Sequence, residues 1–348
     1  MDQTIRFCKA PDGVRIAYAT AGFGYPLVVC QGWIGHLELD WANEHTRGFW
    51  EKLAEHYLVV RYDKRGTGLS DRNVEDYSLE AQAADLGAVV DALDVDRVAL
   101  LGYSQGGPIA LAYAHGHQER ISQLVLYGTY ANGHYAAVSE LAAALWHLVE
   151  ADWEGLGALA MADIYLPGAP TEVREAYADY QRHSASREVA LAQAKTIGAW
   201  NVKGLLKEIN IPALVMHKKG DKPVPFELGR RLARDLPRSR FMPLEGSSHI
   251  IWLGRPDITL NAIMEFLAGA NVGEAAPATA TTPNGIVTRR EKDVLRLIAA
   301  GKSNRQIAAD LCISVNTADR HVSNILTKIA ASNRAQAASY AVRAGIAS

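Results

Sequence analysis

The pentapeptide Gly102-Tyr103-Ser104-Gln105-Gly106 constrains the fold of this 348-residue chain more than any other short segment. The apolar run VALLGY leads into it, and the helical pattern GGPIALAYA follows. A serine on a sharp strand-to-helix turn has a strained backbone, so its neighbours must be small, as these glycines are. A plain strand–helix turn is the alternative, but the flanking patterns favour a nucleophilic Ser104. The Gln105 N–H is then placed to donate to an oxyanion.

Short apolar runs alternate with helical patterns over the first 270 residues. We expect a hairpin from TIRFCKA and VRIAYAT, then buried strands at LVVCQG, YLVVRYD, VALLGY, QLVLYG, ALVMHK and RFMPLE. Helices are expected near 46–56, 78–93, 105–117 and 225–235. This alternation predicts an α/β fold whose mostly parallel sheet is covered on both faces.

Residues 131–210 interrupt the alternation, because they contain helical patterns and no convincing strand. We interpret them as a helical cap over the carboxyl edge of the sheet. The cap carries several large polar or aromatic residues, namely His134, Tyr135, Trp146, His147, Trp153, Tyr165, Tyr177, Tyr180 and Trp200. Some of them are expected to line a pocket for an apolar or aromatic small molecule, and the alternative for each is packing between cap and core.

A serine hydroxyl is a weak nucleophile and needs a base that a third group orients. Downstream of Ser104, Asp221 follows the strand pattern ALVMHK, and His249 follows the strand pattern RFMPLE. The carboxyl ends of parallel strands meet at one edge of a sheet, where such folds gather their chemistry. A turn aspartate and a surface-loop histidine are the alternatives. The order Ser, Asp, His favours a catalytic triad.

The first 270 residues resemble the α/β-hydrolase superfamily, in its branch of esterases and C–C bond hydrolases. The segment YDKRGTGLSD, from Tyr62 to Asp71, matches the Y-D-x-R-G-x-G-x-S signature of that branch. The resemblance implies Ser104 as nucleophile, His249 as base and Asp221 as the residue that orients the base. It also implies that Asp63 and Arg65 hydrogen-bond the neighbouring loops.

The segment Gln31-Gly32-Trp33 departs from this branch, which usually has His-Gly before its oxyanion loop. The second oxyanion N–H is expected from Trp33 or Ile34. A backbone donor survives a side-chain change, but Gln31 alters the hydrogen bonds that hold the loop. Whether the triad turns over is therefore left open by the sequence.

A segment rich in Ala, Thr, Pro and Gly, from Gly269 to Gly285, reads as a linker. It predicts a hydrolase domain over 1–270 with its cap at about 131–210, a linker over 271–285 and a second domain over 286–348. Residues 284–348 carry ten Lys/Arg and four Asp/Glu, a net charge of +6, while the rest of the chain has a net charge of −8. A basic domain on an acidic body is typical of nucleic-acid binding, although basic surfaces have other uses.

The second domain is expected to be all-α, with helices near 288–300, 304–311, 315–329 and 333–344. Thr288 and Glu291 have the spacing of a capping box, and Gly301 is expected to end the first helix. Ser303 or Asn304 is expected to cap the second helix, and Ser314 the third.

Residues 287–340 resemble the LuxR/GerE-type helix-turn-helix over its whole length. The matches are T-R-R-E, A-x-G-x-S-N-x-x-I-A, I-S-x-x-T, H-x-x-N-I-x-x-K and N-R-x-Q-A. The resemblance implies a double-stranded DNA partner, base-facing positions at Asp319, Arg320 and Ser323, and phosphate contacts from Lys302, Asn304, Thr317 and Lys328. Asp319 departs from the basic residue often found there, so it accepts from cytosine N4 or weakens binding. A helical bundle for protein contacts is the alternative.

Composition excludes several other classes. The three cysteines are scattered, with no Cys/His cluster, so neither a metal site nor a cofactor is expected. The N-terminus lacks the apolar stretch of a signal peptide, and no run of about 18 apolar residues occurs, so we expect a cytoplasmic protein with no membrane partner.

These observations predict a DNA-binding transcriptional regulator whose hydrolase domain senses a small apolar or aromatic ligand. Hydrolysis of that ligand and a pure sensor role both stay open. The rival hypothesis is an active serine esterase or C–C bond hydrolase with an accessory C-terminal helical domain. A homodimer is expected, because helix-turn-helix proteins usually read two half-sites.

Overall fold

The computed structural model describes residues 1–134, 140–273, 287, 289–311, 315–329, 331 and 333–347. The chain forms two compact units, one from nearly all of residues 1–270 and a second whose main part is Asn271–Ser348. Among the described residues, no helix combines the length and the apolarity needed to cross a bilayer.

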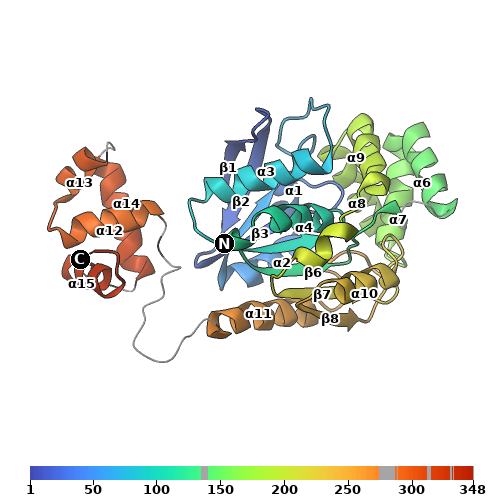
Figure 1. Ribbon diagram of the computed structural model, residues 1–348. Coiled ribbons are helices and arrows are strands. Elements are labelled where there is room, and N and C mark those ends of the chain that lie inside the picture. The colour runs from blue at the N-terminus through green and yellow to red at the C-terminus, as the bar shows by residue number, and fades with distance from the viewer. Residues whose placement is uncertain are drawn as a thin grey trace. The chain divides into compact units, whose positions relative to one another are not determined.

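An eight-stranded sheet forms the centre of the first unit (Figure 1). Its strands, in spatial order, are β1 (Thr4–Lys9), β2 (Arg15–Ala21), β4 (Tyr57–Tyr62), β3 (Tyr25–Cys30), β5 (Val98–Tyr103), β6 (Ile121–Tyr127), β7 (Ala213–Lys218) and β8 (Ser239–Leu244). β1, β2 and β4 pair antiparallel, and every other neighbouring pair is parallel. The expected hairpin and the expected strands are therefore confirmed, but β8, expected to be buried, is an edge strand in which only Leu244 is buried. The parallel strands end at one edge, where the site residues lie.

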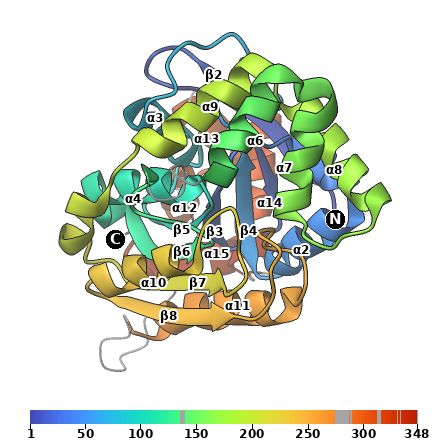
Figure 2. The same ribbon diagram turned by 90° about the vertical axis from the view of Figure 1, so that its right-hand side faces the viewer.

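Helices cover both faces of the sheet (Figure 2). One face carries α2 (Glu44–Ala54) and α11 (Pro256–Gly273), whose Phe49, Trp50, Leu260 and Ile263 join the strands in one apolar core. The other face carries α3 (Leu79–Ala92) and α4 (Gly106–Gly116), with α10 (Phe226–Asp235) against β7 and β8. A short helix, α1 (Leu37–Ala42), follows β3. The predicted α/β class is confirmed.

The segment between β6 and β7 is helical, and its described residues contain no strand, only a bridge between Asn132 and Asn201. Its helices are α6 (Glu140–Ala151), the π-helical turn Trp153–Gly157, α7 (Ala158–Tyr165), α8 (Thr171–Ser184), α9 (Arg187–Ala199) and the 3-10 turn Lys203–Glu208. α6, α7, α8 and α9 gather at the end of the sheet where the parallel strands stop (Figure 1), whereas the turn Lys203–Glu208 packs against α4 and α10, and Glu208 O accepts a hydrogen bond from Gln118, just before β6. Trp153, Met161 and Tyr165 of this helical segment pack with Trp33 and Ile250 of the sheet loops.

The second unit contains α12 (Arg289–Ala299), α13 (Asn304–Asp310), α14 (Val315–Lys328) and α15 (Arg334–Arg343), as predicted. Their core includes Leu295, Ile307 and Ile325, all fully buried. Ser303 is the N-cap of α13 and forms a capping box with Gln306, so the cap falls on Ser303 and not on Asn304. The predicted caps at Thr288 and Ser314 lie outside the described residues.

The predicted start of the linker was placed too early. α11 continues to Gly273, so the helix includes Gly269 and the residues up to Gly273 that were assigned to the linker. Alanine-rich sequence favours helix, and each residue added to an existing helix gains a hydrogen bond, which offsets the modest cost of a glycine. Residues 274–286 lie outside the described residues.

Candidate active site and nucleic-acid interface

The turn between β5 and α4 holds Ser104 in a left-handed conformation, with φ +52°. Hydrogen bonds fix this strained backbone, because the Ser104 N–H donates to Tyr127 O at 3.0 Å and the Thr129 hydroxyl donates to Ser104 O at 2.6 Å. A Cβ at Gly106 would lie 2.1 Å from Cys30 O, so only glycine lets α4 approach β3 this closely. The motif therefore forms the tight elbow that its glycines predict.

Asp221 and His249 lie together after β7 and β8. Nδ1 of His249 is 2.7 Å from Oδ2 of Asp221, and both side chains are buried. The other carboxylate oxygen accepts from the Val224 N–H at 3.0 Å. Burial alone raises the pKa of Asp221, but the opposing effects of His249 and the neighbouring His217 hold that pKa at about 2. The carboxylate is therefore ionised and orients the Nδ1–H tautomer of His249.

His249 presents its other nitrogen to the same cavity that Ser104 lines. Nε2 is buried and has no hydrogen-bond partner among the described residues. The cavity is only about 30 Å³, which is room for about two water molecules. The aromatic residues on its wall are Trp33, Tyr103, Tyr165, Tyr177, Tyr180 and Trp252. An unpartnered base beside a serine is what a nucleophile–base pair needs, and such hydrogen bonds often tighten only when substrate binds.

The cap aromatics divide between cavity and packing. Tyr165, Tyr177 and Tyr180 line the cavity. Trp153 and Trp200 are buried in the core, and Trp146 packs edge-on against Trp33. The His134 and His147 side chains are exposed, and Tyr135 lies outside the described residues.

The two proposed oxyanion donors flank Ser104. Gln105 is fully buried at the start of α4, and Trp33 lines the cavity from the loop after β3. No hydrogen bond between described residues uses either backbone N–H, so both stay available to a ligand oxygen. The Trp33 indole donates to Ala190 O at 3.2 Å, which ties this loop to α9 of the cap.

Gln31, the departure from the family pattern, still braces the loop. Its side-chain amide donates to Tyr62 O at 2.9 Å, which joins the end of β3 to the end of β4. Its Oε1 atom is buried without a partner in the described part of the chain. Gln31 therefore makes one loop contact and leaves one buried acceptor unsatisfied.

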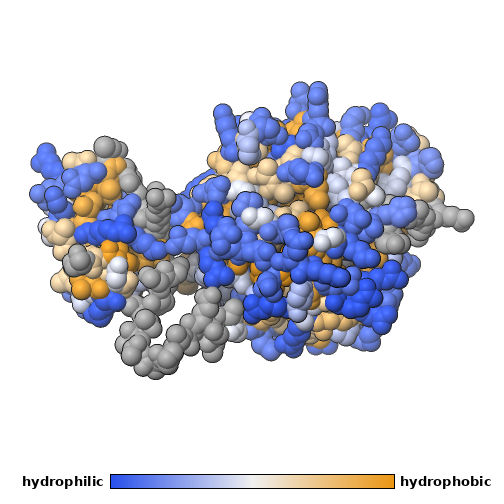
Figure 3. Space-filling view, viewed as in Figure 1, coloured by the Kyte–Doolittle hydropathy of each residue, from blue (hydrophilic) through white to orange (hydrophobic). Residues whose placement is uncertain are grey.

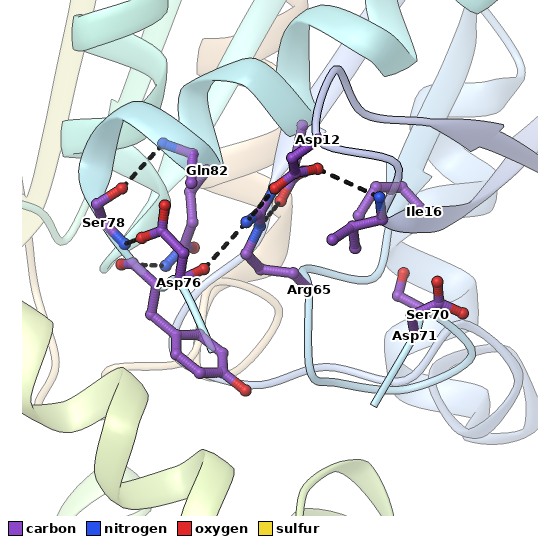
Figure 4. Close-up of polar contacts among 12 residues, drawn as sticks. Asp12, Ile16, Arg65, Ser70, Asp71, Asp76, Ser78 and Gln82 are labelled. Atoms are coloured by element: carbon purple, nitrogen blue, oxygen red, sulfur yellow. Dashed lines mark hydrogen bonds and ion pairs between the residues drawn. The ribbon is translucent and has the colours of Figure 1, made fainter. Parts of the chain in front are cut away.

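The loop after β4 is held as the resemblance implied (Figure 4). Arg65 donates to both carboxylate oxygens of Asp85 at 2.7 Å, pairs with Asp12 at 2.9 Å and donates to Asp76 O at 3.0 Å. Asp63 accepts from the Leu37 N–H at 3.0 Å. These contacts join the β1–β2 turn, α3 and the loop after β3 to one segment.

A buried polar network that the sequence did not predict connects the elbow to the cap. Lys64 donates to the side chain of Gln105 and lies 3.5 Å from Oε1 of Gln193 in α9. The Gln105 amide donates to Gln193 O and to the Thr196 hydroxyl, each at 3.0 Å. Burial lowers the pKa of Lys64 to about 7. Movement of α9 would therefore disturb the residue whose N–H flanks Ser104.

Three further residues next to the triad were not predicted either. Lys218 donates to Ile250 O at 2.9 Å and to Leu253 O at 2.8 Å, so it fixes the loop that carries His249. Gly128, with φ +52°, lies against the Asp221–His249 pair. His217 Nε2 lies 3.5 Å from Asp221. The polar residues His217 and Lys218 at the end of the strand pattern ALVMHK were the available signal.

In the second unit, α14 buries Ala318, Val322 and Ile325 and leaves Asp319 and Ser323 exposed, as expected of base-facing positions. Thr317, Arg320 and Lys328 belong to the same helix, and their side chains lie outside the described part of the structure.

A hydrogen-bonded chain links the candidate DNA-contacting residues of α13 and α14. Asn304 donates to Asp319 at 2.6 Å, and Arg334 of α15 donates to Asn304 Oδ1 at 2.7 Å and to the Lys302 carbonyl. Lys302 pairs with Asp310 at 3.5 Å. The Asp319 carboxylate is thus held by a neighbouring amide, which the sequence did not predict.

Comparison with known proteins agrees with this geometry. Residues 25–256 match the model of the alpha/beta hydrolase fold, and residues 286–341 match the model of the luxR family of bacterial regulatory proteins. "Putative carbamate hydrolase RutD" from Agrobacterium fabrum is 27% identical over 64% of this chain and 87% of its own length. The protein of the same name from Caulobacter segnis is 28% identical, over 73% of this chain and 97% of its own.

Solved structures show the same fold. An esterase from Exiguobacterium antarcticum superposes with a TM-score of 0.66 at 24% identity, covering 75% of this chain and 98% of its own. A meta-cleavage product hydrolase from Pseudomonas fluorescens superposes with a TM-score of 0.63 at 20% identity, covering 76% and 98%. Both likenesses cover the first unit.

Proposed function

Because this chain belongs to the alpha/beta hydrolase family and ends in a luxR-family DNA-binding domain, we propose that it is a transcriptional regulator whose hydrolase domain senses a small apolar or aromatic ligand. One observation carries the proposal. Ser104 and His249, whose Nε2 has no hydrogen-bond partner among the described residues, line a small aromatic cavity in a chain that also carries a DNA-binding domain. A hydrolase with a metabolic role alone has no need of a DNA-binding domain. The inference is drawn from the presence of both domains in one chain.

The proposed ligand has a carbonyl group of the ester or carbamate class. Ser104 Oγ attacks this carbonyl, and Nε2 of His249 takes the hydroxyl proton. Ionised Asp221 stabilises the imidazolium, and the N–H groups of Gln105 and Trp33 receive the oxyanion. His249 then protonates the leaving group, and the acyl group stays on Ser104. In the second half of the reaction His249 takes a proton from water, the water oxygen attacks the acyl carbonyl, and His249 returns the proton to Ser104 Oγ as the acid leaves. Slow turnover of this kind would reset the sensor.

DNA recognition is assigned to α14. Its exposed residues Asp319 and Ser323, together with Arg320 of the same helix, are proposed to meet base edges in the major groove, while Lys302, Asn304, Thr317 and Lys328 are proposed to meet phosphates. The net charge of +6 over residues 284–348 supports phosphate binding. Binding of this kind weakens steeply with salt, because counterions are released.

The test measures coupling between the two domains. Operator DNA is selected from a random pool with the full chain, and its affinity is measured with and without a bound carbonyl ligand. Ligand affinity is then measured for Ser104→Ala, which cannot consume the ligand, with and without operator. A tenfold effect corresponds to about 1.4 kcal/mol and must be equal in both directions. A ligand that fills the cavity and leaves both affinities unchanged would refute the sensor role.

The second candidate is an active serine esterase or C–C bond hydrolase with an accessory helical domain. The complete Asp221–His249 pair and the rigid elbow favour it. Brisk turnover of esters together with the same affinity for every DNA sequence would select this candidate. A serine-directed phosphonate should label Ser104 under either hypothesis, and Ser104→Ala should abolish the labelling.

A further inference from the structure

The cavity beside Ser104 is too small for the ligand that the proposed function requires. Its volume of about 30 Å³ holds a carbonyl group and little more. Small-molecule sites generally have volumes of about 300–1,000 Å³. A ligand that presents its carbonyl to Ser104 must therefore extend beyond this cavity.

A larger cleft of about 490 Å³ lies on the same unit, between α2 and α11. Phe49, Leu260 and Met264 give it an apolar lining, while Lys52 and Asp257 stand among its polar residues. The two helices lie side by side on one face of the sheet (Figure 2). The volume and the apolar lining suit the hydrocarbon or aryl part of a small molecule.

Trp252 belongs to the lining of both spaces. It lies three residues after His249, and it packs against the core of α2 and α11 on one side and against the cap cluster on the other. Its ring meets Trp50 edge-on at 6.1 Å and Tyr103 at 6.2 Å between centroids. Trp252 is therefore the residue that separates the serine cavity from the cleft.

The indole of Trp252 is held by packing, whereas two other tryptophans of the cap cluster are also held by hydrogen bonds. The Trp33 and Trp153 indoles each donate a hydrogen bond to a cap carbonyl at 3.2 Å. No hydrogen bond to another described residue holds the Trp252 indole, which is partly exposed. Rotation of this side chain breaks only ring contacts, and partly exposed side chains change rotamer readily.

We propose that Trp252 is a movable partition, and that the cleft between α2 and α11 binds the apolar acyl or aryl arm of the ligand whose carbonyl lies at Ser104. This inference rests on the proposed function. It adds where the specificity-determining part of the ligand binds, and it assigns that part to the apolar acyl or aryl class. Displacement of Trp252 joins the two spaces into one site of ordinary size.

Substitution of Gly48 by a larger residue tests the proposal, because the new side chain would fill the cleft without disturbing the fold. It lines the cleft, and a Cβ added there would meet no described atom within 4 Å. Leucine also favours a helix more than glycine does, so Gly48→Leu should fold. Gly269→Leu is the matched control, because Gly269 lies in α11, is exposed, has equally open surroundings and is outside the cleft lining.

The first readout is hydrolysis of p-nitrophenyl acetate and p-nitrophenyl octanoate by the full chain. Gly48→Leu should raise the KM for octanoate about tenfold and change that for acetate by less than about twofold, while Gly269→Leu changes neither. Trp252→Ala should raise kcat/KM for octanoate relative to acetate about tenfold, because the partition is gone. Equal behaviour of Gly48→Leu and Gly269→Leu would overturn the proposal.

The second readout does not depend on turnover. Octanoate should raise the melting temperature of wild type and of Gly269→Leu, and the rise should be lost in Gly48→Leu. If wild type hydrolyses neither ester, the hydrolytic part of the proposed function fails while this measurement still tests the cleft. An equal rise in melting temperature for wild type and Gly48→Leu, or no rise for wild type, would refute binding of the apolar arm in the cleft.

Discussion

The ammonium group of Lys218 donates a hydrogen bond of 2.9 Å to the backbone carbonyl of Ile250, the residue that follows His249. Burial lowers the pKa of this lysine to about 8, and Asp221 opposes part of that shift. The structure thus places a buried cation under the loop that positions the proposed base. Its second bond, to Leu253 O, closes the same loop.

Lys218→Met should therefore lower kcat and leave KM nearly unchanged. Misplacement of a catalytic group by about 1 Å costs on the order of 100-fold in rate, so we expect a loss of about 10- to 100-fold. Lys219→Met is the matched control, because Lys219 is exposed and its one ion pair in the described part of the chain is with Glu245. Equal kcat for the two variants, measured with p-nitrophenyl acetate, would show that Lys218 does not position His249.

Asp221 should make stability depend on pH in a narrow acid window. Its folded pKa of about 2 lies below its ordinary value of 3.8. A depressed carboxyl pKa stabilises the fold at pH values above the ordinary one, and that contribution is lost as the pH falls towards the folded pKa. The difference corresponds to about 2 kcal/mol. Urea unfolding between pH 5 and pH 2 should show this loss in wild type.

Asp221→Asn provides the comparison, because it cannot titrate. Its unfolding free energy should fall less than that of wild type between pH 5 and pH 2, by about the same 2 kcal/mol. The variant should also lose about 10⁴-fold in kcat, because the wrong imidazole tautomer is held. Parallel pH profiles of the two proteins would mean that the carboxylate is not selectively stabilised in the fold.

Gly128→Ala should impair the Asp221–His249 pair. Its new Cβ would lie 3.2 Å from Asp221 Oδ2 and 3.3 Å from His249 Cε1, which is tight contact with both partners. We expect kcat to fall by about 10-fold or more. Gly168→Ala is the control, because Gly168 also has a positive φ, and the methyl group that alanine adds there would have no described neighbour within 4 Å. Both variants carry similar backbone strain, so the difference in kcat between them measures the effect of the contact with Asp221 and His249.

Asp319→Asn should strengthen DNA binding. The substitution keeps an oxygen that can accept from Asn304 and removes a negative charge from the exposed face of α14. Affinity for random duplex should rise several-fold, most at low salt, because repulsion from phosphates is relieved. Asp293→Asn removes the same charge from α12, where Asp293 pairs with Arg296. A comparable gain from Asp293→Asn in salt titrations would assign the effect to net charge alone.

Val342→Lys should weaken the expected homodimer, because the last helix, α15, is rich in small residues and is a candidate surface for contact between two copies of the chain. The Val342 side chain is 55% exposed on that helix, and Figure 3 shows hydrophobic residues reaching the surface of the C-terminal domain. A lysine at the centre of an apolar contact resists desolvation, so dimer affinity should fall at least about tenfold in light scattering. Val173→Lys, at an exposed valine of α8, should have no effect. A wild-type protein that is monomeric both free and on DNA would rule out the dimer.

Local patterns were enough to predict the elements and the candidate triad. Ser104, Asp221 and His249 each follow a strand that its apolar residues mark, and parallel strands bring their carboxyl ends to one edge. The C-terminal helices were equally readable, since their apolar period and turns are local. The linker was expected to begin at Gly269, whereas α11 continues to Gly273, because a segment with no apolar period can still extend an existing helix.

The residues around the triad depended on tertiary structure. Lys218 meets Ile250, Gly128 meets His249, and Trp252 meets Trp50, although each pair is far apart in the chain. Sequence by itself determined which strands and helices form and where the candidate site residues emerge, because periodicity and turn chemistry act over a few residues. Only the packed structure decided how small the serine cavity is and which residue separates it from the cleft, because cavity volume depends on side chains that the fold brings together from distant segments.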